Sequence, residues 1–118
     1  MSTGGTENGD ADRVVDHGEL YDALSNRRRR FAIHYLKQRP EAHVDMGDLS
    51  THVAAWEEGI DPDEVSYDRR KTVHTALYQH HAPTLDETGL VEYDAARGEI
   101  ALTDAGRAVD LYLEAVRG

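Results

Sequence analysis

The apolar residues of the chain recur at helical spacing over most of its length, beginning near residue 18. A first helical region is predicted over residues 18–39, because the apolar side chains of its second half share a face at i, i+1, i+4 and i+5. Ser25 and Asn26 offer a cap that would break this helix in two, and Pro40 would end it. The apolar residues of the region are Leu20, Tyr21, Leu24, Phe31, Ala32, Tyr35 and Leu36.

A short extended segment at residues 43–46 precedes a second predicted helix. Asp48 can cap this helix, because a carboxylate accepts hydrogen bonds from the free amides of a first turn. Gly59 would end it, and the turn-forming residues 60–64 connect it to the next helix. Its apolar residues are Leu49, Val53 and Trp56.

The third predicted helix begins at the cap residue Ser66 and runs to about His81, where Pro83 would close it. Its apolar face repeats at i, i+3, i+4 and i+7 and consists of Val73, Ala76, Leu77 and His80. Because His80 lies on this face, we expect it to be a hydrogen-bonded core residue.

Between residues 90 and 102 the apolar period changes to two, which is typical of strands. The two alternating runs flank residues 94–98, where Gly98 permits a positive φ, so a β-hairpin is predicted. Thr103 and Asp104 would then cap a last helix. Its apolar stripe consists of Val109, Tyr112, Leu113 and Val116.

The order of these elements, with a hairpin after the third helix, is that of a winged helix-turn-helix domain. We therefore predict a mainly α fold with a small β-hairpin wing over residues 18–118, in which the third helix enters the DNA major groove. Residues 1–17 are predicted to be a disordered acidic tail, because periodic apolar positions are missing there.

The chain is strongly acidic: it has 23 Asp and Glu residues and 13 Lys and Arg residues, which give a net charge of −10. Only Lys37 and Lys71 are lysines. An acidic excess with scarce lysine is typical of halophilic proteins, because the electrostatic screening length falls to about 3 Å at 1 M salt. An acidic protein from a low-salt organism is the alternative. In either case the position of the few cations decides whether DNA can bind.

Several functional classes are disfavoured. The chain has no cysteine, no apolar run of about 20 residues and no signal-like apolar core near its start, so we expect a cytoplasmic protein without a membrane partner. His74, His80 and His81 have a spacing that does not assemble a metal site. No phosphate-binding loop or nucleophile motif is present, so we expect no cofactor, no bound metal and no enzyme activity.

Three stretches carry a more specific signal: LSNRRRR at residues 24–30, HAPTL at 81–85 and GLVEYD at 89–94. Together they resemble a haloarchaeal family of winged-helix domains, largely of unknown function, whose members are taken to be transcription regulators. The resemblance spans residues 20–102 and implies an archaeal winged helix that regulates transcription. The family typically has a His-x-His-Leu-Pro-Lys-Leu run, in which Gln79, Ala82 and Thr84 here replace the first His, the Leu and the Lys.

Helical geometry selects the residues that would face DNA, because successive residues turn by about 100°. Lys71 and Thr75 lie nearly opposite the apolar face. Lys71 can donate to guanine and Gln79 can pair with adenine, whereas Arg69 and Arg70 lie nearer the core edge and would grip phosphates. The predicted DNA contacts are Tyr67, Arg69, Arg70, Lys71, Thr72, Thr75, Gln79, Arg97, Arg27 and Arg28. The alternative is that residues 69–71 are only a solvated helix start.

The strongest basic cluster is residues 27–30, four consecutive arginines. Four consecutive residues circle a helix, so a single groove cannot hold them all. Some of them either contact the DNA backbone or pair with carboxylates such as Asp22 or Glu19.

The sequence therefore predicts a DNA-binding transcriptional regulator that forms a homodimer, because one small domain offers few base contacts. The dimer contact is assigned to Leu20, Leu24, Val109, Tyr112, Leu113 and Val116, which could instead cover the domain's own core. One alternative function is a protein–protein interaction module that has lost DNA affinity. A weaker alternative is a non-specific architectural protein.

Overall fold

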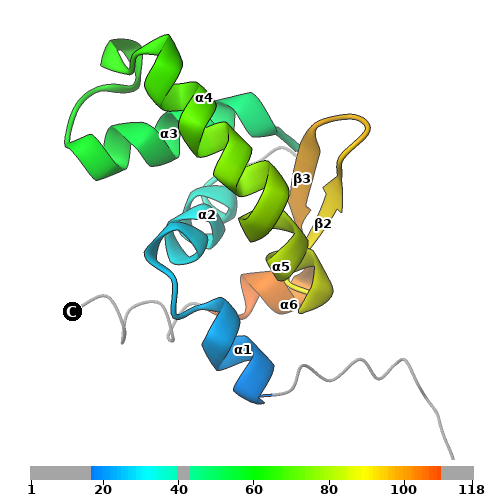
Figure 1. Cartoon of the computed structure of the whole chain (residues 1–118). Coiled ribbons are helices and arrows are strands. Elements are labelled where there is room, and N and C mark those ends of the chain that lie inside the picture. Colours follow the sequence, from blue (N-terminus) through cyan, green and yellow to red (C-terminus); the bar gives the residue numbers. More distant parts are fainter. Residues whose placement is uncertain (1–16, 40–42, 110–118) are drawn as a thin grey trace, which may run out of the picture.

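The computed structural model describes residues 17–39 and 43–109. The helices are α1 (His17–Ala23), α2 (Arg27–Lys37), α3 (Met46–Glu58), α4 (Tyr67–Ala76), α5 (Ala82–Glu87) and α6 (Asp104–Arg107), with a 3-10 turn η1 (Pro62–Glu64) and a π-helical segment η2 (Leu77–His81). The strands are β1 (Val44–Asp45), β2 (Val91–Asp94) and β3 (Glu99–Leu102). The fold is mainly α with a small antiparallel sheet, which confirms the predicted winged-helix class (Figure 1).

Three predicted helix caps are confirmed. The side chains of Asn26, Ser66 and Thr103 accept hydrogen bonds from free amides in the first turns of α2, α4 and α6. Asn26 also separates α1 from α2, so the first helical region is broken as predicted. Gly59 ends α3 with a φ of 70°, a left-handed conformation that glycine adopts at little cost.

The N-cap of α3 is Asp45, and the prediction of Asp48 is wrong. The Asp45 carboxylate accepts from the amides of Gly47 and Asp48 at 2.8 and 3.2 Å. Strand β1 ends at Asp45 and α3 begins at the next residue, so Asp48 falls inside the first turn. Its negative charge there still suits the positive end of the helix dipole.

The elements α4, η2 and α5 form one continuous helical rod that runs towards the hairpin (Figure 1). The prediction that Pro83 closes the third helix is therefore wrong. Pro83 lies in the first turn of α5, directly after a π-type hydrogen bond from the Ala82 amide to the Leu77 carbonyl. In this wide turn the amides already bond five residues back instead of four. Proline lacks an amide hydrogen, but because the regular pattern is already interrupted here, Pro83 does not end the rod.

The π-helical turn also changes which residues are buried. Val73, Leu77, His81 and Leu85 are all buried at a constant spacing of four residues. In a regular α-helix each step of four rotates the side chain by about 40°, so three steps would carry it about 120° around the helix. The wider turn offsets this drift. His81 is therefore the core histidine, and the predicted core position of His80 is wrong, because His80 is exposed.

The sheet has the strand order β1-β3-β2, with both pairings antiparallel. The predicted hairpin is confirmed: Tyr93 lies opposite Ile100, and Gly98 in the loop has a φ of 67°. Strand β1 pairs with the other edge of β3, where Val44 also lies opposite Ile100. The sheet thus ties the start of α3 to the wing.

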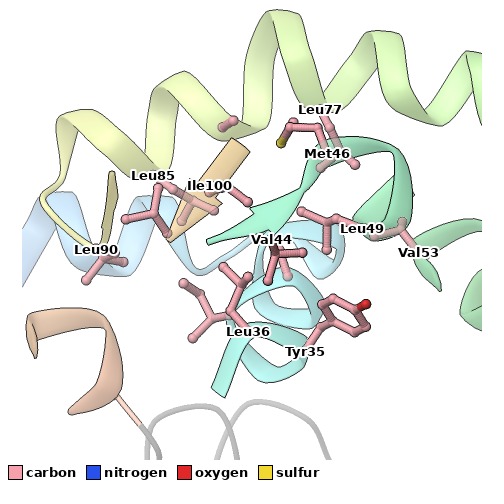
Figure 2. Packing of buried hydrophobic residues seen from close by; sticks show 14 of the residues in the cluster. Tyr35, Leu36, Val44, Met46, Leu49, Val53, Leu77, Leu85, Leu90 and Ile100 are labelled. Carbon is pink, nitrogen blue, oxygen red and sulfur yellow. The ribbon is translucent and has the colours of Figure 1, made fainter. Parts of the chain in front are cut away.

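Side chains from α2, α3, the rod and the sheet meet in one core (Figure 2). Trp56, predicted on the apolar face of α3, is 39% exposed and stacks on Phe31 with ring centroids 4.7 Å apart. Of the residues assigned to a dimer contact, Leu24 and Val109 are buried in this core and Leu20 packs against it. Large fully buried side chains include those of Leu24, Ile33, Met46, Leu49, Leu77, Leu85, Leu90 and Ile100.

Some predictions fall on residues outside the described ranges. They concern the acidic tail up to residue 16, the helix end at Pro40, and Tyr112, Leu113 and Val116 of the C-terminal stripe. Within residues 17–39 and 43–109, no helix combines the length and the apolar character needed to cross a membrane.

The start of α6 packs so closely on the preceding segments that it requires glycine. A Cβ at Gly106 would overlap the carbonyl oxygen of Leu90 and lie 2.5 Å from Cδ1 of Leu102. Because a backbone oxygen cannot easily move aside, we expect Gly106→Ala to lower the free energy of unfolding by about 3 kcal/mol. Urea denaturation in constant salt measures this change.

Gly98→Ala is the matched control for that substitution. It adds the same methyl group into open space, and only the positive φ of residue 98 opposes it. We expect a loss of about 1 kcal/mol from this backbone conformation. Equal losses in the two variants would contradict the close packing of α6.

Candidate nucleic-acid interface

Helix α4 presents most of its side chains to solvent. It packs on α3, yet Val73 alone among its residues is buried. Five of the predicted DNA contacts are exposed and come together on the rod. We call this surface the outward face; it consists of Tyr67, Asp68, Lys71, Thr72 and Thr75 of α4 with Tyr78 and Gln79 of η2.

Arg70 lies at the edge of the outward face and is half-buried. Its guanidinium lies 5.5 Å from the centre of the Tyr67 ring, within the range of a cation–π contact. This contact supports the Tyr67 ring while leaving it 64% exposed. Arg70 and Lys71 are therefore the cations that α4 places at the outward face.

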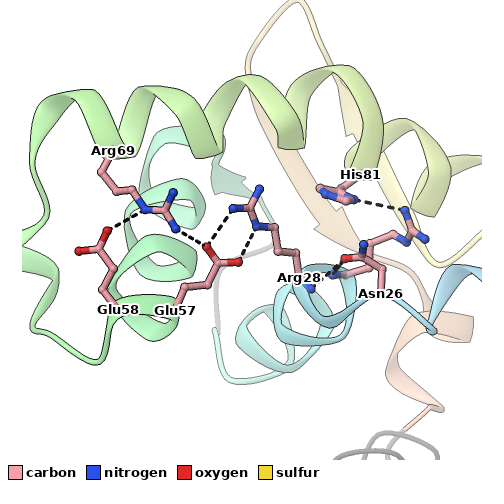
Figure 3. Close-up of polar contacts among 7 residues, drawn as sticks. Asn26, Arg28, Glu57, Glu58, Arg69 and His81 are labelled. Atoms are coloured by element: carbon pink, nitrogen blue, oxygen red, sulfur yellow. Dashed lines mark hydrogen bonds and ion pairs between the residues drawn. The ribbon is translucent and has the colours of Figure 1, made fainter.

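Arg69, predicted to grip phosphate, is directed instead at α3. Its Nη2 donates to Oε1 of Glu57 at 2.8 Å, and its Nε lies 2.7 Å from a carboxylate oxygen of Glu58. Glu57 also accepts two hydrogen bonds from Arg28, at 2.5 and 2.9 Å (Figure 3). The hydrogen bond from Arg28 is the main cause that holds the pKa of Glu57 below its ordinary value. We call these three residues, Arg28, Glu57 and Arg69, the Glu57 junction.

Arg29 and Arg30 bind the C-terminal end of α1. Arg29 is only 9% exposed, and its Nε donates to the carbonyl of Ala23 at 2.6 Å. Arg30 donates to the carbonyl of Leu24 at 2.9 Å. Helix C-termini leave carbonyls without helical partners, and cations there also suit the helix dipole. The two arginines thus attach α1 to α2.

The sequence left open whether residues 27–30 contact DNA or carboxylates, and each of the four arginines has a partner within the protein. Arg27 completes the set, with its guanidinium 5.0 Å from the centre of the Trp56 ring. The carboxylate that pairs with Arg28 is Glu57 rather than Asp22 or Glu19. This partner is 29 residues away, so local helical spacing contains no signal for it.

His81 is 5% exposed, and its Nδ1 lies 3.2 Å from Nη1 of Arg29. A guanidinium only donates, so Nδ1 must accept and the neutral ring carries its proton on Nε2. Burial, with the positive charge of Arg29, lowers the pKa of His81 to about 4. His81 thus joins η2 to α2. Within the described part of the chain, no group of three His, Asp or Glu side chains could hold a metal ion.

The wing stands beside the C-terminal half of the rod (Figure 1). Tyr78 contacts Tyr93 of β2 edge-on, with ring centroids 6.1 Å apart. The Tyr93 amide also donates to the carboxylate of Asp86 in α5 at 2.8 Å. Arg97 lies in the hairpin loop with its side chain 74% exposed, 3.8 Å from Asp94. The rod and the wing are thus joined, and both present cations to solvent.

The low pKa of His81 predicts a loss of stability in mild acid. Between pH 6.5 and about 4 the unfolded histidine binds a proton that the folded one does not, so the free energy of unfolding falls as pH falls. We expect a loss of about 2 kcal/mol between pH 6.5 and 5, measured by urea denaturation. This window lies above the titration of Glu57, whose pKa is lowered from 4.5.

His81→Gln is expected to remove this pH dependence, because glutamine offers an uncharged acceptor to Arg29. His80→Gln, at the exposed neighbouring position, should keep the wild-type dependence. The same slope in His81→Gln and wild type would contradict the assignment to His81.

No curated protein and no solved structure matches this chain significantly. The family described as Domain of unknown function (DUF7344) matches residues 21–101, a range that includes the outward face, the Glu57 junction and all of the wing except Leu102. Because this match covers more than half of the chain, the protein belongs to the DUF7344 family, a domain of unknown function.

Proposed function

We propose that this protein is a DNA-binding transcriptional regulator that places α4 in the major groove. The observation that carries the proposal is the outward face, a row of exposed side chains that begins on α4, which contributes the single residue Val73 to the core, and continues onto η2. The wing stands beside this face and offers Arg97 to the adjacent backbone or minor groove.

Within this proposal, few cations take part. Arg69 and Arg28 are engaged in the Glu57 junction and act by holding α4 in place, and Arg27 lies over Trp56 of α3 and is not part of the outward face. Arg70, Lys71 and Arg97 remain for phosphates and bases. In a salt-rich cytoplasm, which the composition favours, counterion release contributes little to affinity. Binding would then depend on hydrogen bonds and packing at the outward face.

Lys71→Ala tests the proposed interface. Lys71 is exposed at the middle of the outward face, so we expect this variant to bind its preferred DNA about tenfold more weakly. Arg107→Ala removes the same charge from the exposed surface of α6 and should bind within about twofold of wild type. Fluorescence anisotropy with genomic DNA fragments over a KCl series measures both affinities.

Two results would contradict the proposal. Equal affinities of wild type and Lys71→Ala would exclude the outward face as the contact. Absent or unselective binding by wild type at every salt concentration would exclude a sequence-specific regulator.

We also propose that two chains pair through the C-terminal stripe, because two-fold pairing doubles the base contacts on half-sites about one helical turn apart. Leu24 and Val109 are buried in the chain's own core, so the contact would rest on Leu20 and the apolar residues of the C-terminal segment. These are Tyr112, Leu113 and Val116.

Light scattering in molar KCl tests the pairing. We expect a mass near twice 13.2 kDa for wild type, and a monomer for Leu113→Asp, because a buried unpaired carboxylate opposes association. A monomeric wild type at working concentration would contradict the homodimer.

A protein–protein interaction module is the second candidate function. The engagement of Arg69 inside the protein favours it, as do the exposed rings of Tyr67 and Tyr78, since tyrosine is enriched in protein interfaces. Absence of DNA binding by wild type in the KCl series would support this candidate.

A further inference from the structure

The outward face has little charge for a DNA-binding surface. Asp68 and Lys71 are its charged residues and have opposite signs. The others, Tyr67, Thr72, Thr75, Tyr78 and Gln79, are uncharged. Discrimination between base pairs at this face must therefore come from hydrogen bonds and apolar contacts.

The threonine hydroxyls of this face are engaged by the helix itself. Thr72 Oγ1 donates to the carbonyl of Asp68 at 3.1 Å, and Thr75 Oγ1 donates to the carbonyl of Lys71 at 3.0 Å. This back-bonding uses the hydroxyl proton and fixes the side-chain rotamer. Both threonines are exposed, and with their hydroxyl protons used, their methyl groups are the apolar surface they offer to a ligand.

Two exposed aromatic rings, each in contact with a neighbouring side chain, lie before and after these threonines along the rod. Tyr67 is 64% exposed and lies against Arg70, whereas Tyr78 is 46% exposed and lies against Tyr93 of the wing. Tyr78 follows Tyr67 by eleven positions, which corresponds to about 16 Å of helix. At about 3.4 Å per base step, this length spans four to five base pairs.

The major groove offers one apolar group for such a surface, the 5-methyl group of thymine. On the basis of the proposed function, we propose that the outward face recognises DNA half-sites rich in A·T pairs, with Thr72 and Thr75 contacting thymine methyl groups. Gln79, at the wing side of this surface, would pair with adenine through N6 and N7. Because apolar contacts do not depend on charge, this recognition persists at the salt concentrations that weaken phosphate contacts.

Deoxyuridine tests this inference, because it differs from thymidine by the 5-methyl group alone. A duplex selected by the full chain from a random DNA library in molar KCl is synthesised with each thymine replaced in turn. Loss of one buried methyl group should weaken binding about fourfold at the contacted positions. Fluorescence anisotropy gives the affinities.

A pair of matched variants assigns the contact to a residue. Thr75→Ser removes the methyl group and keeps the hydroxyl, so the penalty for deoxyuridine should disappear at one position of the duplex. Thr75→Val keeps a methyl group and should retain the penalty. Thr72→Ser should abolish it at a different position. These residues are exposed, and far-UV circular dichroism verifies that each variant folds.

The outcomes separate the inference from the proposed function. If the library yields a preferred sequence but no deoxyuridine weakens binding, or if every penalty persists in both Ser variants, the inference is wrong and the regulator proposal stands. If no sequence is enriched at any salt concentration, the proposed function itself fails, and with it the inference.

Discussion

The carboxylate of Glu57 joins the three helices α2, α3 and α4 through its ion pairs with two arginines. It is 19% exposed and receives Arg28 from α2 and Arg69 from α4 while itself belonging to α3. No residue between 67 and 72 is buried, and the apolar contacts nearest to the start of α4 are those of Val65 before it and Val73 within it. Between these two contacts, the pairing of Arg69 with Glu57 and Glu58 attaches the first turn of α4 to α3. Removing Glu57 alone would leave the partly buried guanidinium of Arg28 without its carboxylate and Arg69 with Glu58 alone, which is more costly than removing Arg28 and Glu57 together.

This arrangement explains how an acidic chain uses its few cations. The arginines of residues 27–30 fasten α1, α2 and α3 to one another through carbonyls, a carboxylate and an aromatic ring. Arginine suits these positions because its planar group donates in several directions at once and stacks on rings. Arg28 and Arg69 near the start of α4 thus form ion pairs within the protein, and the outward face is nearly neutral.

The sequence was sufficient to predict those features that depend on residues close together in the chain. The caps Asn26, Ser66 and Thr103 and the exposure of Lys71, Thr72 and Thr75 were predictable, because capping and regular helical rotation are local. The partner of Arg28 was not predictable, since Glu57 follows it 29 positions later in the chain. Nor was the burial of His81, because a polar residue shows no apolar periodicity and a regular helix places His80 there instead.

The π-helical turn is a place where members of this family can differ in length by one residue. Such a turn holds one residue more than an α-helical turn. A relative lacking one residue between 77 and 81 could continue as regular α-helix and still carry Leu85 and Leu90 into its core. Its exposed residues around position 79, however, would be rotated relative to the wing. A single-residue gap at this place in an alignment would therefore mark a changed outward face on an unchanged fold.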